Sequence, residues 1–212
     1  MKANRTLLAV AILGLLAILL PTAESCSCQQ QHPQTAFCAS EYVIVAQVLR
    51  RTSSKDRPAL DAYKIAIKKE YKMSEEARKF LRHGKLFTAS SGSMCGITLE
   101  PNKLYAIAAN SEQVGLCDYV HPYSNLTIVE RRGLSGIYRK GCGCRINHCW
   151  KHKCSRRVGS CNWTPSTAKI DCTASFSSCV PAGVVNEDGT PIKCHWRRSQ
   201  HFGQCMVENG GK

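Results

Sequence analysis

The chain has 212 residues and a formal net charge of +14, because 29 lysines and arginines outweigh 15 aspartates and glutamates. A positive charge of this size favours anionic partners. Beyond one apolar stretch near its start, no segment is long and apolar enough for a membrane span, which excludes a polytopic membrane protein.

The first residues are typical of a secretory signal peptide. A basic start precedes the apolar stretch Leu7 to Leu20, which is shorter than the roughly 20 residues that a membrane anchor needs. Small residues at Ala23 and Ser25 fit the pattern that a signal peptidase accepts. We therefore predict a signal peptide over residues 1–25, cleavage before Cys26, and a protein secreted to the extracellular matrix.

The 14 cysteines divide the remaining chain in two. Residues 26–142 hold six of them, widely spaced, whereas residues 144–205 hold eight, a density typical of small modules with a thin core. We expect two domains, 26–142 and 143–212, with the cysteines in seven disulfides. The rival prediction is a zinc ribbon, which irregular spacing and an oxidising compartment disfavour; its ligands would be Cys142, Cys144, Cys149 and Cys154.

The predicted elements of residues 26–142 are mostly strands. Pro33 suits the first turn of a short helix that ends near Ser40. The stretch Ser74–Gly84 opens on a serine cap and closes on a glycine, which predicts one short helix or turn. A longer helix is expected over Thr127–Lys140. Runs rich in β-branched residues, or alternating apolar and charged residues, predict strands over Tyr42–Leu49, Ala62–Tyr71, Lys85–Ala89 and Lys103–Ala109.

Five strands with a late helix in little over 100 residues suggest a small closed β-barrel of the oligosaccharide/oligonucleotide-binding (OB) kind, although the sequence does not place the fifth strand. Beyond Cys142 the residues predict short strands and loops around the cysteines, with turns at Asn186–Gly189. The predicted fold class is mainly β with a few short helices: an OB-fold barrel followed by a small disulfide-rich β domain. Composition alone does not distinguish this barrel from another small barrel or sandwich.

Five motifs, in order, resemble the tissue inhibitors of metalloproteinases, and the resemblance covers essentially the whole mature chain. Each motif is modest alone, but the ordered set is highly specific. The resemblance implies the netrin-like form of the OB-fold and a secreted inhibitor, not an enzyme. The motifs are C-x-C at Cys26, HPQ-x-AFC at His32–Cys38, SMCG at Ser93–Gly96, LYAIA at Leu104–Ala108 and GIYRKGCGC at Gly136–Cys144.

The resemblance also implies how the protein acts. In the family, the α-amino nitrogen and carbonyl oxygen of the first mature residue, here Cys26, chelate the catalytic zinc of the target at its open position. An α-amine with a pKa of about 7.7–8.0 loses its proton easily near neutral pH. Ser27 would enter the adjacent substrate pocket, so the protein needs no cofactor of its own. The remaining inhibitory residues would be Cys28, Ser91, Gly92, Ser93 and Met94.

Family pairing implies six disulfides, and two further cysteines exceed the usual twelve. The extra cysteines, Cys172 and Cys205, are expected to pair with each other, although the sequence leaves other partners open. Gln30 and Ser27 stand where the family commonly has proline and threonine, which puts the rigidity and selectivity of the segment in doubt. The implied pairs are Cys26–Cys95, Cys28–Cys117, Cys38–Cys142, Cys144–Cys194, Cys149–Cys154 and Cys161–Cys179.

The expected partners are zinc metalloproteinases of the matrix metalloproteinase and adamalysin type, bound by a monomer. Basic pairs are scattered along the chain, so sulfated glycosaminoglycans and an ordinary solvated surface explain them equally well, whereas nucleic acid is not expected outside the cell. Two sequons permit glycosylation, at Asn125 and Asn162, and Asn125 is favoured because Trp163 is a bulky middle residue.

Two other function classes compete with the inhibitor. A netrin-like module could bind matrix, growth factors or heparan sulfate without touching a protease, but it has no need to begin at a cysteine. An enzyme is disfavoured because no H-E-x-x-H or G-x-S-x-G pattern is present. His148 and His152 have the helical spacing of a metal site, but an ordinary pair of surface histidines is the favoured interpretation. His32 is expected to be structural.

Overall fold

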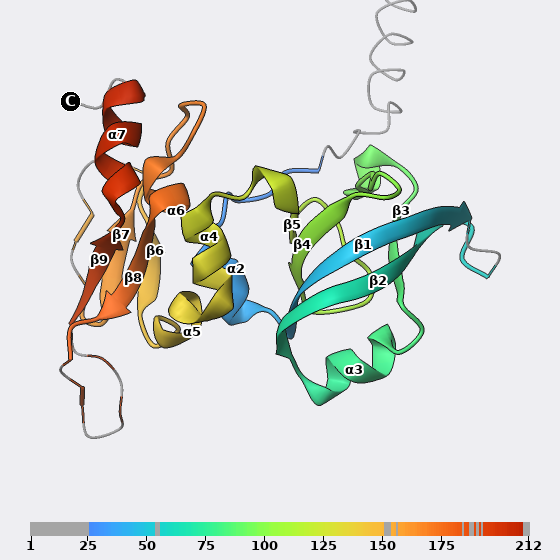
Figure 1. Ribbon diagram of the computed structural model, residues 1–212, viewed down its shortest axis with the longest axis horizontal. Coiled ribbons are helices and arrows are strands. Elements are labelled where there is room, and N and C mark those ends of the chain that lie inside the picture. The colour runs from blue at the N-terminus through green and yellow to red at the C-terminus, as the bar shows by residue number, and fades with distance from the viewer. Residues whose placement is uncertain are drawn as a thin grey trace, which may run out of the picture.

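The computed structural model describes residues 26–53, 56–150, 154–155, 157–183, 185–186, 189, 191 and 193–209, so the predicted signal peptide lies outside the described residues. Figure 1 shows two units, a five-stranded sheet and a smaller group of short strands, with short helices between them. Among the described helices, none is long and apolar enough to cross a membrane.

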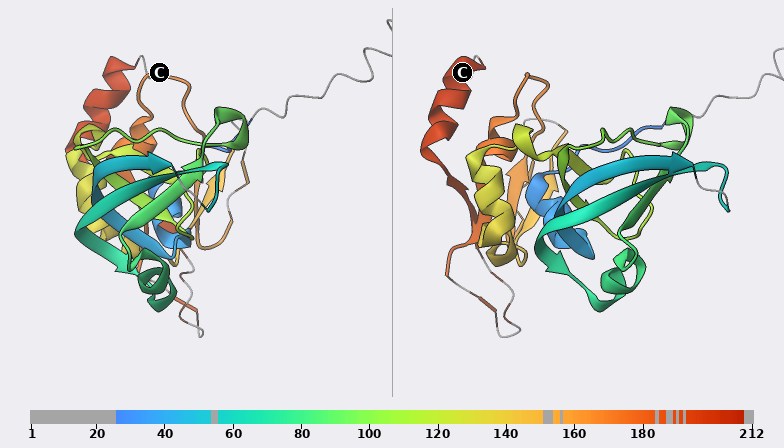
Figure 2. Two further views of the ribbon diagram at one scale, coloured as in Figure 1. Left: turned by 90° about the vertical axis from the view of Figure 1, so that its right-hand side faces the viewer. Right: turned by 45° about the vertical axis from the view of Figure 1, so that its right-hand side comes forward.

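The first unit is one antiparallel sheet with the strand order β3-β2-β1-β4-β5. It curls into an OB-like half-barrel (Figure 2), in which β3 and β5 are the edge strands. All four predicted strands are present, with β1 and β2 longer than expected, and β5 is the strand that the sequence did not place. The bounds are β1 Tyr42–Ser53, β2 Leu60–Met73, β3 Lys85–Ala89, β4 Leu104–Ala109 and β5 Tyr119–Pro122.

Strand β1 lies at the centre of the sheet, and its first half, residues 42–48, is buried on both faces, whereas residues 49–53 are exposed. Successive side chains point to opposite faces of a strand, and Tyr42 and Ile44 belong to one apolar core while Val43 and Val45 belong to another. The run YVIVA is therefore continuously apolar instead of alternating. Helix α3 (Glu75–Leu81) packs on the first core, and helix α2 (Pro33–Ala39) packs on the second.

Both short predicted helices are present, each with the predicted signal at its start. Ser74 caps α3 by accepting a hydrogen bond from the backbone N–H of Ala77 at 3.1 Å. Pro33 occupies the first turn of α2, and the ring of His32 caps this helix by accepting from the N–H of Gln34 at 3.1 Å.

The late helix has nearly the predicted extent but is broken. It begins as α4 (Ile128–Arg132), continues as the wider turn η3 (Gly133–Ile137) and ends as α5 (Tyr138–Lys140). Gly136 has φ 154°, outside the helical region, so the helical hydrogen-bond pattern is interrupted there. The predicted helical stretch is therefore present, with a break at this glycine that the sequence analysis did not anticipate.

The second unit contains two separate two-stranded sheets and little apolar core. Strands β6 (Arg145–His148) and β7 (Ser160–Trp163) pair in parallel, and β8 (Ser177–Pro181) pairs antiparallel with β9 (Cys194–Arg198). Helices α6 (Cys172–Phe176) and α7 (Gln200–Glu208) complete the unit. Disulfides supply much of its interior, as cysteine density predicted, and the predicted turn is present, with the Gly189 N–H donating to the Asn186 carbonyl at 3.0 Å. The mainly β fold class is confirmed.

Candidate functional site at the N-terminal ridge

Two disulfides hold the beginning of the described chain against the first unit. Cys26 is joined to Cys95 and Cys28 to Cys117, each with Cα atoms 5.2 Å apart. The two bonds are adjacent, since the sulfur atoms of Cys26, Cys95 and Cys117 all lie within 4.8 Å of one another. An extended segment with no strand partner is thereby fixed at its first and third residues.

The stretch that carries Cys95 is a compact turn, η1 (Gly92–Met94). It closes through hydrogen bonds from the Cys95 N–H to the Gly92 carbonyl at 3.0 Å and from the Gly96 N–H to the Ser91 carbonyl at 3.1 Å. Gly96 allows this close approach, because a Cβ atom on it would lie 2.0 Å from the carbonyl oxygen of Ala89. The motif SMCG therefore encodes a rigid backbone shape rather than a reactive side chain.

We call residues 26–28 together with 91–95 the N-terminal ridge. Figure 1 shows its first segment beginning beside the lobe that holds η1. Ser27 is exposed between two half-buried cysteines, and Gly92, Ser93 and Met94 are exposed beside it. Met94 keeps 52% of its surface in solvent, so its apolar side chain is accessible to a partner. The structure thus brings together all seven residues that sequence analysis assigned to inhibition.

All 14 cysteines are described, and none is free. Cys172 pairs with Cys205, with Cα atoms 5.7 Å apart, and the other pairs are those that the family resemblance implies. The zinc-ribbon alternative leaves no thiolate to bind a metal, because its four candidate ligands belong to three separate disulfides. These are Cys38–Cys142, Cys144–Cys194 and Cys149–Cys154; the remaining pair is Cys161–Cys179.

In helix α2, the side chain of Gln34 connects the two units. It is 1% exposed, donates to the carbonyl oxygens of Gly141 and Cys179 at 3.0 and 2.7 Å, and accepts from the Cys179 N–H at 2.8 Å. Sequence reasoning used Gln34 only as a letter of the HPQ motif and missed this role. The available signal in the sequence was a glutamine directly after the proline that starts a helix. This signal does not indicate which residues the glutamine contacts.

His32 is also buried between the units. Its ring lies 5.4 Å from the ring of Trp163 and 5.2 Å from that of Trp196. Because Nδ1 accepts from Gln34, the proton of the neutral ring is on Nε2, which faces the Thr173 carbonyl at 3.3 Å. Burial lowers the pKa of His32 to about 4, so the ring is neutral at physiological pH. His32 is structural, as expected.

The other candidate residues lie away from the N-terminal ridge. The ring of His148 contacts that of Trp150 in a tilted arrangement and that of Trp163 edge to face, whereas His152 lies outside the described residues. Asn125 is exposed at the end of the turn η2 (Tyr123–Asn125). Asn162 is half-buried in β7, and its amide donates to the Cys154 carbonyl at 3.1 Å.

Comparisons with known proteins agree with these motifs. The family model described as "Tissue inhibitor of metalloproteinase" matches residues 24–196. The chain is 36% identical over 205 residues to a tissue inhibitor of metalloproteinase of Drosophila melanogaster, covering 92% of this chain and 96% of that protein. It is 34% identical over 167 residues to metalloproteinase inhibitor 3 of Gallus gallus, covering 73% and 78%, and 31% identical over 213 residues to metalloproteinase inhibitor 2 of Homo sapiens, covering 92% of each. The chain therefore belongs to the tissue inhibitor of metalloproteinase family, whose members inhibit metalloproteinases and are not enzymes.

Proposed function

We propose that this protein is secreted, begins at Cys26 after removal of residues 1–25, and inhibits zinc metalloproteinases of the extracellular matrix through the N-terminal ridge. The observation that carries the proposal is the pair of disulfides that fixes Cys26 and Cys28 while Ser27 between them stays exposed. If this segment only had to be held in place, one disulfide would be enough, whereas here two disulfides fix three consecutive residues.

In the proposed complex, the α-amine and the carbonyl oxygen of Cys26 bind the catalytic zinc of the target. A catalytic zinc keeps an exchangeable position that water normally occupies. A neutral amine is a suitable ligand for this position, and the carbonyl oxygen of the same residue, three bonds away from the nitrogen, closes a chelate ring with it. The sulfur of Cys26 takes no part, because it is bonded to Cys95. The metal belongs to the target, so the inhibitor carries no cofactor.

Ser27 would then enter the substrate pocket next to the zinc, and η1 would lie along the substrate cleft. Fixing the segment before binding reduces the conformational entropy that a free peptide loses when it docks. The exposed Met94 would contribute apolar contact area to the target. Because no residue precedes Cys26 in the mature chain, the zinc would face an amine and not a peptide bond that could be hydrolysed.

Residues 26–142 and 143–212 are proposed to be the two domains. The first range contains the N-terminal ridge and the complete five-stranded sheet. The contacts of Gln34 and His32 with Cys179 and Thr173 join the two ranges, so the second domain would support the segment that follows the ridge.

A single alanine added before Cys26 tests the proposed mechanism. It converts the amine to an amide nitrogen, which has no available lone pair, and it places an extra residue where the zinc is expected. Inhibition of a matrix metalloproteinase catalytic domain should fall by orders of magnitude while the thermal unfolding midpoint stays the same. Acetylation of the native terminus should have the same effect. Equal inhibition by the extended and native chains would rule out chelation by Cys26.

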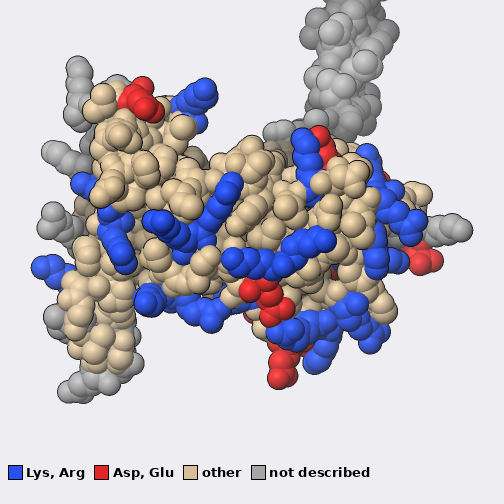
Figure 3. Space-filling model, viewed as in Figure 1, with Lys and Arg blue, Asp and Glu red and all other residues tan. Residues whose placement is uncertain are grey.

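A second candidate function, binding of sulfated glycosaminoglycan, is favoured by one groove on the basic face of the molecule (Figure 3). Lys69, Arg139 and Lys140 line this groove, and Glu70 lies beside them. Glu70 forms an ion pair with Arg78 at 2.6 Å, so its negative charge is already balanced by a cation outside the groove. If the groove binds heparin, replacing Lys69 and Lys140 by glutamine should lower the salt concentration that elutes the protein from heparin without changing inhibition.

A further inference from the structure

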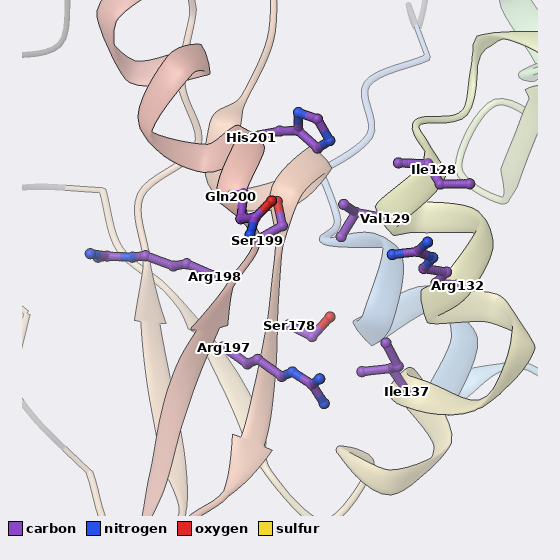
Figure 4. Close-up of a pocket in the computed structure, with 10 residues that line it drawn as sticks. All are labelled: Ile128, Val129, Arg132, Ile137, Ser178, Arg197, Arg198, Ser199, Gln200 and His201. Carbon is purple, nitrogen blue, oxygen red and sulfur yellow. The ribbon is translucent and has the colours of Figure 1, made fainter.

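A pocket of about 540 Å³ lies between the end of the first unit and the second unit, far from the N-terminal ridge in sequence. Figure 4 shows its two walls: α4 and η3 on one side, and β8, β9 and the start of α7 on the other. Arg132 from α4 and Arg197 from β9 extend toward each other across it, whereas Arg198 points away. Arg198 instead stacks on the ring of Phe202, 4.5 Å from its centroid.

The two facing guanidinium groups have no anionic partner among the residues that the structure describes. Elsewhere in the described chain five basic side chains do form ion pairs, among them Arg51 with Asp61 and Lys103 with Glu100. Two like charges facing one pocket repel each other, and an anion between them relieves this repulsion. Guanidinium groups also bind carboxylates through two parallel hydrogen bonds.

Polar groups at the base of the pocket add donors for the same ligand. Ser178 is only 3% exposed, its hydroxyl points into the pocket (Figure 4), and it makes no side-chain hydrogen bond within the described part of the chain. Ser199 is the N-cap residue of α7, yet its side chain caps no backbone N–H, and its buried Oγ has no partner there either. Helix α7 therefore begins beside the pocket without the side-chain oxygen that usually accepts from the first N–H groups of a helix.

Besides Arg132, the wall formed by α4 and η3 carries apolar side chains, which favour a peptide over a polysaccharide. Ile128 is 50% exposed there, next to Val129 and Ile137. A sulfated polysaccharide needs an extended row of cations, whereas this pocket is recessed, has charges on two sides and presents aliphatic side chains between them. An acidic residue next to an aliphatic residue matches both features.

We infer that this pocket is a binding site for an acidic segment of a protein partner, in which a carboxylate lies between Arg132 and Arg197 and a neighbouring aliphatic side chain packs on Ile128. The carboxylate would accept hydrogen bonds from Ser178 and from the N-terminus of α7. This site is separate from the N-terminal ridge, so an acidic partner and a metalloproteinase can bind to one molecule at the same time.

Fluorescence anisotropy of a labelled Glu-Leu-Glu-Leu peptide, titrated with the full mature chain, tests the inference. The peptide should bind, its Gln-Leu-Gln-Leu counterpart should not, and added salt should weaken the complex. Replacing Arg132 or Arg197 by glutamine should weaken binding about tenfold or more, since a hydrogen bond to a charged group contributes at least about 1.4 kcal/mol. Arg145→Gln, which removes the same charge from an exposed position on β6, is the matched control and should bind as the native chain does.

A second variant, Ser199→Asp, keeps the test decisive if an arginine variant does not fold. Its own carboxylate would cap α7 and occupy the anion position, so the unfolding midpoint should hold or rise while peptide binding is lost. Metalloproteinase inhibition should be unchanged in every variant, which separates this site from the proposed inhibitory one. The inference is wrong if the native chain does not bind the acidic peptide, if Arg145→Gln weakens binding as much as Arg197→Gln, or if a heparin hexasaccharide binds through Arg132 and Arg197 while the peptide does not.

Discussion

Gln34 of helix α2 forms two hydrogen bonds with the backbone of Cys179 in strand β8, accepting from its N–H at 2.8 Å and donating to its carbonyl at 2.7 Å. Its side-chain amide thus bonds to this strand as a peptide group of a neighbouring strand would. On the other side, Cys179 is opposite Trp196 of β9. One glutamine from the first unit therefore covers an edge of a sheet in the second unit, where unpaired backbone groups would otherwise be buried.

Replacing Gln34 by leucine should destabilise the protein strongly. The substitution keeps the approximate volume but removes the partner of the Cys179 N–H and of the Cys179 carbonyl, and each buried unsatisfied group costs about 1–3 kcal/mol. The Gly141 carbonyl keeps its hydrogen bond from the Cys144 N–H at 2.9 Å. Urea unfolding should show a loss of about 2 kcal/mol or more. Gln31→Leu, on an exposed neighbour, is the control and should change the free energy of unfolding by less than about 0.5 kcal/mol. A similar small change for Gln34→Leu would mean that the two units do not depend on this contact.

Acid should destabilise the protein through His32. Its pKa is about 4 in the folded chain and about 6.5 when unfolded, so between these values the unfolded state binds more protons. The stability due to neutral His32 is present above pH 6.5 and falls by about 3 kcal/mol as the pH decreases to 4. Unfolding free energies of the native chain and of His32→Asn, measured across this range, should differ in slope, because asparagine can still cap α2 but does not titrate.

The comparison with His32→Asn is needed because Glu130 contributes with the opposite sign. Burial raises the pKa of this carboxyl in the folded chain, so its protonation stabilises the folded state as the pH falls. Only the difference in unfolding free energy between the native chain and His32→Asn gives the contribution of the histidine. Parallel curves for the native chain and the variant would show that His32 is protonated without cost and is not the acid-sensitive group.

Ser27→Gly should weaken inhibition and leave folding intact. Ser27 is exposed, so the substitution removes no buried contact within the chain. In the proposed complex its side chain enters the substrate pocket, and the loss of one such contact corresponds to about 1–3 kcal/mol. Inhibition constants against several metalloproteinases, together with the unfolding midpoint, provide the measurement. Unchanged constants for every enzyme would remove Ser27 from the list of specificity residues.

Glycosylation should occur at Asn125 and not at Asn162 in the folded, secreted protein. The amide nitrogen of Asn162 donates to the carbonyls of Cys154 and Ser155 at 3.1 and 3.4 Å, and an attached sugar would disrupt these bonds. Asn125 is exposed at the end of η2. Mass spectrometry should show that Asn125→Gln removes the enzymatically releasable glycan and that Asn162→Gln leaves it. A glycan retained by Asn125→Gln would contradict this assignment.

The sequence by itself determined the features that depend on short-range chemistry. Ser74 and Pro33 predicted the starts of two helices, because capping and the fixed φ of proline act within a few residues. The apolar run from Tyr42 predicted a strand, and the order of the cysteine-containing motifs predicted the inhibitor family. Each of these patterns depends on residues that are close together in the sequence, so it can be interpreted without knowledge of distant residues.

Only the tertiary structure decided the features that depend on distant residues. Gln34 and Cys179 are 145 positions apart, and nothing near either one predicts their contact. The short strand β5 exists because β4 pairs with it, and α7 is held in place by the bond from Cys205 to Cys172. The pocket between Arg132 and Arg197 likewise exists only after both units have folded, because its charges come from elements that the sequence keeps far apart.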